Sequence, residues 1–327
     1  MNQYFIINRM TSNMKLRLAT KVAHFYYEKG LLQKQIAEQM YLSQASISRL
    51  LRKAREENIV RTQVSIPVGV YSNIESLLEE KYGLKEAIIA EVTSDSDEEI
   101  TRVLGNAAAY YLETTLSDNE IIGISSWSTN LLAMVNAMQP LDNLKGIKVV
   151  QILGGLGNPA AKNHANHLIK HLSSMVNGEP IFMPAPGIAP KKISASTYKE
   201  DDYVKLALDM FKEITTAIVG IGTMKPSELL ANSGNFFSPE ELESLKDIGA
   251  VGDICLHFFN DQGNPVRSSL DQRVIGMSLA DIKNTPRSIG IAGGKRKVEA
   301  ILASLRGNYL DILITDNITA EIILDHS

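Results

Sequence analysis

The amino-acid sequence predicts an α/β protein in two parts, an N-terminal winged helix-turn-helix and a larger, doubly wound α/β domain. Two short amphipathic segments separated by only three residues predict the first part. From residue 120 onward, short apolar runs alternate with helical patterns, and this alternation is typical of a parallel sheet covered on both faces. We expect residues 1–66 to form the winged helix-turn-helix, 67–92 a connector and 93–327 the larger domain.

The helix-turn-helix is predicted to begin with a helix from near Met14 to Gly30, since glycine favours the end of a helix. Two shorter helices are expected at Gln33–Met40 and Gln44–Glu56, and the Ser43 hydroxyl can cap the second of them. Their apolar residues have the i, i+3, i+4, i+7 spacing of a buried helix face. The residues expected in this small core are Ile36, Ala37, Met40, Ile47, Leu50, Leu51 and Ala54.

The outward face of the second short helix carries side chains suited to DNA. Gln and Arg can make paired hydrogen bonds to adenine and guanine edges, while Ser, Arg and Lys bind phosphates. The residues expected to contact DNA are Gln33, Ser43, Gln44, Ser46, Ser48, Arg49, Arg52 and Lys53. The alternating apolar and polar residues at 59–66 predict the strand of a wing, which Pro67 ends. Two short helices also occur in domains that bind no nucleic acid, so the motif needs support from its context.

The distribution of charge supplies that context. Residues 1–61 hold eleven of the 33 Lys and Arg residues but only four of the 37 Asp and Glu residues, so their net charge is +7 against −11 for the rest. A basic head on an acidic body favours a polyanionic partner at the head alone. The single Cys255 excludes an internal disulfide, and no apolar run reaches membrane-spanning length. We therefore expect a cytoplasmic protein with no membrane partner.

Strands and helices are expected to alternate through the larger domain. A helix at Tyr71–Tyr82, a strand at Glu86–Val92 and a helix at Asp97–Thr115 precede this alternation. The expected strands are Ile121–Ser125, Lys148–Leu153, Pro180–Met183, Ala217–Ile221, Asp253–Phe258, Ser288–Ala292 and Asp311–Thr315. The helices between them are expected near Asn130–Met138, Ala161–Val176, Asp201–Ile214, Pro239–Lys246, Lys295–Leu305 and Ile318–Leu324.

The ends of these strands are rich in glycine and hydroxyl residues. Ligands of a doubly wound sheet bind beyond the carboxyl ends of the strands, where exposed amides, hydroxyls and basic side chains can hold an anion. We therefore expect a phosphate-sized site, although any one of these loops could be only a tight turn, because none has a Walker or G-x-G-x-x-G pattern. The loop residues assigned to it are Ser125, Ser126, Ser128, Thr129, Gln151, Gly154, Gly155, Gly222, Gly293, Gly294 and Lys297.

Neither catalysis nor metal binding is indicated. His164, His167 and His171 have the spacing of one helix face, but without a carboxylate partner a solvated or packed face is favoured over a metal site. Asp253 could act as a general base or bind sugar hydroxyls, and binding is favoured because no nucleophile triad or carboxylate pair accompanies it. Cys255 is expected in the core. We expect no catalytic residue, metal or cofactor.

Seven motifs follow one another through the chain. The first, QKQIAEQMYLSQASISRLLRKAREENIV, spans residues 33–60. The others are KVVQILGGLG at 148–157, MPAPGI at 183–188, AIVGIGT at 217–223, GAVGDICLHFFNDQGNPV at 249–266, RVIGMSLADI at 273–282 and IGIAGGKRKVEAILASLRGNYLDILITDNITA at 289–320. As an ordered set they resemble the SorC/DeoR-type sugar-responsive transcriptional regulators of bacteria, over nearly the whole chain.

The resemblance implies that the larger domain has the fold of sugar-phosphate isomerases and glucosamine-phosphate deaminases, used to bind an effector. It further implies that Arg273, the Gly293-Gly294 turn and Lys297 hold the anion of the effector. Asp253 stands where the family contacts effector hydroxyls. The family's Gly-x-Ser-Trp-Gly-Thr loop matches Gly123–Thr129 only with an insertion and with a serine where glycine is usual.

These observations together predict a transcriptional regulator, expected to be a repressor of a carbohydrate or polyol operon. Its partners would be double-stranded operator DNA and a phosphorylated sugar or polyol. One recognition helix reads only a few base pairs, so a homo-oligomer, either dimer or tetramer, is part of this prediction. The alternative is a sugar-phosphate isomerase or deaminase with a DNA-binding head. The expected site counts against that alternative, because Asp253 is its single acid or base candidate.

Overall fold

The computed structural model describes residues 14–60, 71–158, 162–235 and 237–326. The chain divides into two compact units, residues 1–65 and 66–327.

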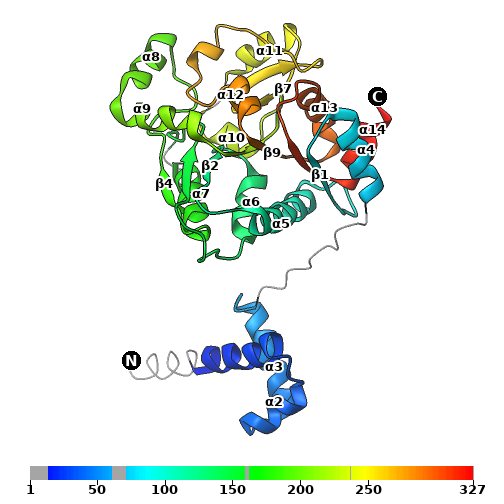
Figure 1. The fold of residues 1–327 in the computed structure, drawn as a ribbon. Coiled ribbons are helices and arrows are strands. Elements are labelled where there is room, and N and C mark those ends of the chain that lie inside the picture. The colour runs from blue at the N-terminus through cyan, green and yellow to red at the C-terminus, as the bar shows by residue number, and fades with distance from the viewer. Residues whose placement is uncertain (1–13, 61–70, 159–161, 236, 327) are drawn as a thin grey trace. The chain divides into compact units, whose positions relative to one another are not determined.

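The first unit is built from short helices (Figure 1). A helix over residues 14–23 ends in a π-helical turn, η1 (His24–Glu28). The two helices of the predicted motif follow as α2 (Gln33–Met40) and α3 (Gln44–Glu56). Their apolar faces close on each other as the spacing predicts. The buried residues of this core are Ala19, Val22, Ala23, Ile36, Ala37, Ile47, Leu51 and Ala54, with Met40 and Leu50 packed against them.

The turn between α2 and α3 is fixed by local hydrogen bonds. Tyr41 adopts a left-handed conformation with φ of 55°, and the backbone N–H of Leu42 donates to the carbonyl of Ala37. The Ser43 hydroxyl accepts a hydrogen bond from the Ser46 N–H at 3.2 Å, which confirms the predicted cap of α3. Most of the strand predicted at 59–66, and with it the wing, lies outside the described residues.

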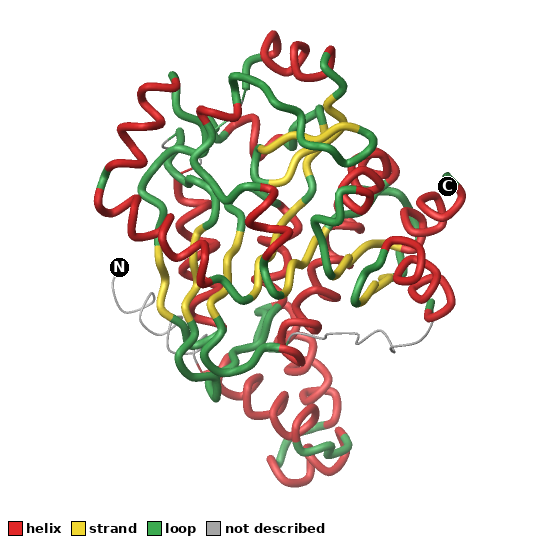
Figure 2. Tube along the Cα trace, turned by 45° about the horizontal axis from the view of Figure 1, so that its top comes forward, coloured by secondary structure: helices red, strands yellow, loops and turns green. Residues whose placement is uncertain are grey.

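A seven-stranded parallel sheet forms the centre of the second unit (Figure 2). Its strand order is β1-β10-β9-β5-β2-β3-β4, and every neighbouring pair is parallel. The strands are β1 (Glu86–Ala90), β2 (Ile121–Ile124), β3 (Lys148–Gln151), β4 (Glu179–Ile181), β5 (Thr216–Gly220), β9 (Arg287–Ile291) and β10 (Ile312–Asp316). This arrangement confirms the predicted doubly wound α/β class.

Helices cover both faces of this sheet, so successive side chains of one strand enter different cores. On β5, Ile218 belongs to one buried cluster, while its neighbours Ala217 and Val219 belong to the other. The helices are α4 (Ser72–Tyr82), α5 (Asp97–Thr115), α6 (Thr129–Ala137), α7 (Lys162–Met175), α8 (Lys192–Glu200), α9 (Asp202–Asp209), α10 (Glu228–Asn232), α11 (Pro239–Asp247), α12 (Leu279–Asn284), α13 (Val298–Arg306) and α14 (Asn317–Asp325), with short 3-10 turns η2 (Met210–Glu213), η3 (Asp271–Arg273) and η4 (Lys295–Lys297).

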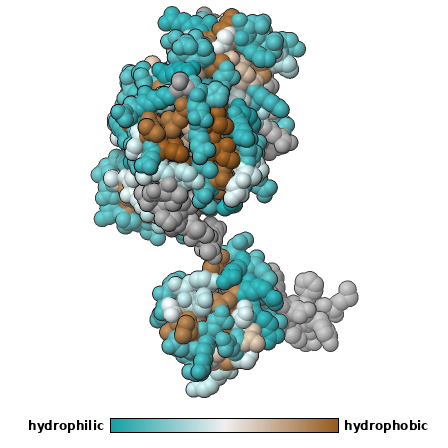
Figure 3. Space-filling model, turned by 90° about the vertical axis from the view of Figure 1, so that its right-hand side faces the viewer, coloured by the Kyte–Doolittle hydropathy of each residue, from teal (hydrophilic) through white to brown (hydrophobic). Residues whose placement is uncertain are grey.

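The segment expected to be a connector belongs to the second unit. Strand β1 is an edge of the large sheet, and α4 packs against β1 and α14. The carboxylates of Glu75 and Glu79 accept hydrogen bonds from the backbone N–H groups of Ile89 and Ala87, each at 2.9 Å. These carboxylates occupy the place that a further strand would take at the open edge. Figure 3 shows apolar residues gathered on the face of this unit that carries α4 and α14.

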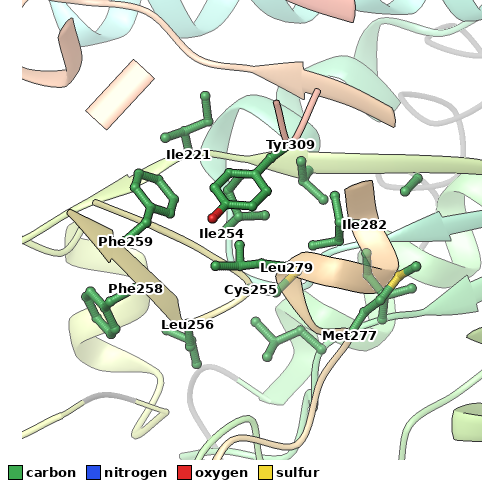
Figure 4. Packing of buried hydrophobic residues seen from close by; sticks show 14 of the residues in the cluster. Ile221, Ile254, Cys255, Leu256, Phe258, Phe259, Met277, Leu279, Ile282 and Tyr309 are labelled. Atoms are coloured by element: carbon green, nitrogen blue, oxygen red, sulfur yellow. The ribbon is translucent and has the colours of Figure 1, made fainter. Parts of the chain in front are cut away.

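The single strand predicted at Asp253–Phe258 is wrong. The structure instead has a hairpin of β7 (Ala250–Ile254) and β8 (His257–Asn260), which joins β6 (Gly222–Thr223) in a separate antiparallel sheet. Cys255 and Leu256 form its turn with φ of 52° and 64°. The uninterrupted apolar run hides this turn, because neither residue is a usual turn former. Figure 4 shows both residues within the apolar packing of the hairpin.

The carboxylate bonds of α4 allow a test. Glu75→Ala leaves the N–H of Ile89 without its acceptor, and we expect a loss of about 1–2 kcal/mol in the free energy of unfolding. Urea denaturation measures this loss. Glu80→Ala removes an exposed carboxylate from the same helix and serves as the control. Equal stability of the two variants would contradict the role given to Glu75.

Candidate functional site

A cavity open to solvent lies at the carboxyl edge of the large sheet. Its wall combines five segments that are distant in the sequence: the loop from β2 into α6, Leu153 after β3, the residues that follow β5, the end of β7 with its turn, and η4. This is the position that a doubly wound sheet offers to a ligand. Six of the residues predicted for the site line the cavity, namely Ser125, Ser128, Thr129, Gly222, Asp253 and Lys297.

Asp253 supplies the acidic group of the cavity. It is 7% exposed, and burial raises the pKa of its carboxyl group to about 6. The N–H of Leu256 donates to Asp253 Oδ2 at 2.9 Å and partly offsets the rise in the pKa, as does the positive charge of Lys297. A Cβ atom on Gly222 would lie 2.0 Å from Asp253 Oδ1. Glycine at 222 therefore allows the carboxylate to reach its position.

Lys297 supplies a half-buried positive group. Its Nζ donates to the carbonyl oxygen of Ile221 at 2.8 Å. Removal of the ammonium from water lowers the pKa of Lys297 to about 8; the charge of Arg296 lowers it further, whereas Asp253 raises it. The carbonyl bond fixes the ammonium at one wall of the cavity.

Two further basic residues line the cavity, and the sequence did not single them out. Arg296 precedes Lys297 in η4, and Lys225 is an exposed residue of the loop after β6. The Thr223 hydroxyl shapes that loop by donating to the Lys225 carbonyl at 2.8 Å. The three basic residues of the lining face a single acidic one, Asp253. The cavity is therefore suited to an anion. The run Lys295-Arg296-Lys297 was the available sequence signal for Arg296.

Four of the predicted residues lie behind the cavity lining and support it. Ser126 and Gln151 are buried and hydrogen-bond each other at 2.9 Å, from Gln151 Nε2 to Ser126 Oγ. Ser126 Oγ also donates to the Leu153 carbonyl at 2.6 Å, and Gln151 Oε1 accepts from the Met183 N–H at 3.0 Å. With these bonds made, both side chains hold the strand ends in place.

The other two, Gly154 and Gly155, lack side chains because their neighbours lie too close. A Cβ atom on Gly154 would lie 2.3 Å from the Pro186 carbonyl oxygen, and one on Gly155 would lie 2.0 Å from Gln151 Nε2. Close packing of the backbone therefore explains both glycines without a ligand.

The Gly293-Gly294 turn also lies outside the cavity lining. The N–H of Gly294 donates to Asp316 Oδ2 at 2.8 Å and to Thr319 Oγ1 at 2.7 Å. Since this amide already has two acceptors within the protein, it is not free to bind the anion of a ligand. The turn instead anchors η4, which carries Arg296 and Lys297.

Arg273, assigned to the anion by resemblance, is engaged elsewhere. Its guanidinium forms an ion pair with Glu241, donates from Nε to the Ala189 carbonyl at 2.8 Å and lies over the Phe237 ring. It is absent from the cavity lining. These contacts join η3, which carries Arg273, to α11 through Glu241 and to the backbone at Ala189. The position of Arg273 in the chain does not reveal this, because the ion-pair partner is 32 residues away.

Two of the three histidines of the predicted row lie close together on α7. The rings of His167 and His171 lie 5.3 Å apart, and the side chain of His164 lies outside the described residues. Within the described part of the chain, no group of three or more His, Cys, Asp or Glu side chains is placed to hold a metal ion. The same part contains no helix long and apolar enough to cross a membrane.

The predicted DNA-contacting residues lie on accessible parts of α2 and α3. Ser43, Gln44, Ser48, Arg49 and Arg52 are exposed, whereas Gln33, Ser46 and Lys53 are half-buried. The Arg49 side chain folds back along the helix, with Nε 3.3 Å from the Ala45 carbonyl. Arg55 adds another exposed positive charge on α3, and its Nε donates to the Tyr27 hydroxyl at 3.0 Å.

Comparison with known proteins places the whole chain among regulators. The sugar-binding domain family model matches residues 67–325. The deoxyribonucleoside regulator of Bacillus subtilis (strain 168) is 34% identical over 95% of this chain and 98% of its own length. This chain belongs to the SorC/DeoR-type family of sugar-binding transcriptional regulators. The sorbitol operon regulator of Klebsiella pneumoniae is 28% identical over 96% of this chain and 100% of its own.

Solved structures of family members agree with this assignment. The full-length sorbitol operon regulator of Klebsiella pneumoniae matches with a TM-score of 0.78 at 29% identity, covering 94% of this chain and 98% of that one. The sugar-binding domain of the regulator DeoR from Pseudomonas syringae pv. tomato matches with a TM-score of 0.62 at 37% identity, over 78% of this chain and 99% of that one. The resemblance stated from the motifs is therefore confirmed.

The contacts of Arg273 predict a structural role for that residue. Arg273→Ala leaves the Glu241 carboxylate, 28% exposed, without its cation, and we expect a loss of about 1–3 kcal/mol in the free energy of unfolding. Urea denaturation measures it, with Arg267→Ala as a surface control. A variant that kept wild-type stability but lost the binding of phosphorylated ligands would instead favour the role implied by resemblance.

Proposed function

We propose that this protein is a DNA-binding transcriptional repressor of a carbohydrate, polyol or deoxyribonucleoside catabolic operon, controlled by a phosphorylated effector that binds in the cavity. The relatives named deoxyribonucleoside regulator and sorbitol operon regulator support the proposal over nearly their full lengths. The observation that carries the effector part is the cavity itself, because Lys225, Arg296 and Lys297 outnumber the one acidic residue of its lining.

The two kinds of charge in the cavity suit the two ends of such an effector. A phosphate needs positive groups, which Lys297 and Arg296 offer, and hydroxyl groups need an acceptor, which Asp253 offers. The hydroxyls of Ser125, Ser128 and Thr129 add neutral partners where α6 begins. A phosphorylated sugar or polyol combines both requirements in one small molecule.

The DNA-binding part of the proposal rests on α3. Its exposed Gln44, Arg49 and Arg52 are of the types that read bases and bind phosphates. A dimer or tetramer would supply the paired recognition helices that an operator needs. Exposed apolar side chains on the second unit offer surface for such contacts, namely Leu77, Ile193, Tyr203 and Leu206. We propose that the protein works in the cytoplasm, where operator DNA and phosphorylated metabolites are found.

The rival function is an isomerase or deaminase, in which Asp253 and Lys297 would move protons. Asp253 is tied to the Leu256 N–H and Lys297 to the Ile221 carbonyl, so both are already held as ligand-binding groups. Burial raises the pKa of the Cys255 thiol, which makes it a poor nucleophile. Interconversion of ketose and aldose phosphates at ordinary enzyme rates would overturn the regulator-only proposal.

Thermal shift against sugar and polyol phosphates tests the effector. We expect stabilisation by at least one phosphorylated compound and much less by its unphosphorylated form. The effect should be largest between pH 6 and pH 8. Below about 6 Asp253 takes up a proton and ceases to be a full acceptor, and above about 8 Lys297 loses its positive charge. Absence of stabilisation by every compound would contradict the proposal.

Operator binding tests the recognition helix. Arg49→Ala should weaken operator binding by about 1–3 kcal/mol if the side chain reads a base. The effector should stabilise this variant as much as it stabilises the wild-type protein. Fluorescence anisotropy at one fixed salt concentration measures the affinity. Arg17→Ala removes an exposed positive charge from the first helix and is the matched control. Unchanged operator affinity of Arg49→Ala would argue against docking through this face.

A further inference from the structure

One basic residue of the cavity lining is already paired with a carboxylate at the surface. Arg296 Nε lies 3.1 Å from Asp97 Oδ1, and Arg296 Nη2 lies 3.0 Å from Asp97 Oδ2. The two parallel contacts form a bidentate pair between η4 and the first residue of α5. Both side chains remain accessible, with exposed fractions of 45% for Arg296 and 69% for Asp97. Arg296 thus lines the cavity while its guanidinium is bound to Asp97, which is outside the lining.

A phosphate group would bind the same N–H donors of that guanidinium. Arg presents a planar fork of donors that matches carboxylates and phosphates equally in geometry. Lys297, the neighbouring cation, has its Nζ engaged with the Ile221 carbonyl and acts only as a point charge. Arg296 is therefore the residue of the lining best suited to paired hydrogen bonds with a phosphate. Asp97 already binds its donors.

We propose that Asp97 competes with the phosphate group of the effector for Arg296 and thereby sets the affinity of the cavity for phosphorylated ligands. The inference rests on the proposed function, because it takes the effector to be a phosphorylated molecule. It assigns a role to a residue outside the cavity lining, and Asp97 acts through Arg296 as a positioning residue.

The surroundings allow Arg296 to change partner without disturbing the loop that carries it. The N–H of Gly294 is held by Asp316 and that of Lys295 by Asp95, whose Oδ1 lies 3.0 Å away. An exposed ion pair is weak, so a ligand that also meets Lys297 can displace it. The charge of Asp97 reaches the cavity, since it helps to raise the pKa of Lys297.

The test is isothermal titration of the full chain with inorganic phosphate, sorbitol 6-phosphate and ribose 5-phosphate, and with sorbitol and ribose as unphosphorylated probes. Asp97→Asn frees Arg296, and we expect the phosphorylated probes to bind about two- to fivefold tighter at low ionic strength. Binding of sorbitol and ribose should not change. Asp97→Glu keeps a carboxylate and should return the affinity toward the wild-type value.

Two further variants separate competition from a general charge effect. Glu98→Gln removes an equal charge from the same helix turn, where Glu98 is exposed and has no cation partner among the described residues. We expect little change in affinity for this variant. In an Arg296→Gln background, Asp97→Asn should no longer increase affinity, because the shared partner is gone.

The outcomes distinguish the two proposals. If the wild-type protein binds phosphorylated probes but Asp97→Asn binds them no tighter, the competition is wrong and the proposed function stands. An increase that Glu98→Gln reproduces, or that persists without Arg296, also overturns the competition. If the wild-type protein binds none of the phosphorylated probes and no other sugar phosphate stabilises it, the proposed function fails and the competition fails with it.

Discussion

The parallel sheet of the second unit is covered on both faces, and this constraint decides where polar chemistry can lie. Alternate residues of β5, such as Ile218 and Val219, belong to two different cores, so neither side of the strand is free to present a polar group to a ligand. Only the strand ends remain. Ser125 follows β2 at that edge, and Asp253 lines the same cavity from β7 of the separate antiparallel sheet.

Periodicity predicted the fold well because burial repeats regularly along the chain. The apolar runs at Ile121–Ser125 and Ala217–Ile221 agree with β2 and β5 to within one residue, and Ile47 and Leu51 lie buried on α3 as their spacing predicts. The strand predicted at Asp253–Phe258 was wrong because a turn interrupts it. That turn depends on a left-handed backbone at Cys255 and Leu256, which neither residue type predicts. A side-chain acceptor, Asp253, stabilises the turn instead of a glycine.

The site was predicted less completely, because residue types do not reveal their partners. Gly294 and Arg273 are reasonable anion ligands by type, yet Asp316 and Glu241 already engage them. Lys297 keeps one wall of the cavity charged because its partner, the Ile221 carbonyl, is neutral. Whether a group can bind a ligand depends on the hydrogen bonds and ion pairs that it already makes with distant segments of the chain. No pattern along the chain contains that information.

The hydrogen bonds and ion pairs around η4 indicate which group can change its partner when an effector binds. A ligand shifts a protein between states only by binding one of them more tightly, so a group that changes partner on binding is where such a difference can arise. Lys297 and the Gly294 amide are hydrogen-bonded to fixed partners, the Ile221 carbonyl and the Asp316 and Thr319 side chains. Arg296 alone among these groups pairs with an exposed carboxylate, that of Asp97 on α5, and α5 contacts β1. Strand β1 in turn is bonded to α4, the first described element after residue 70. Under the proposed competition, an exchange at Arg296 would affect α5 and, through β1, the helix α4, which follows the predicted recognition helix in the sequence.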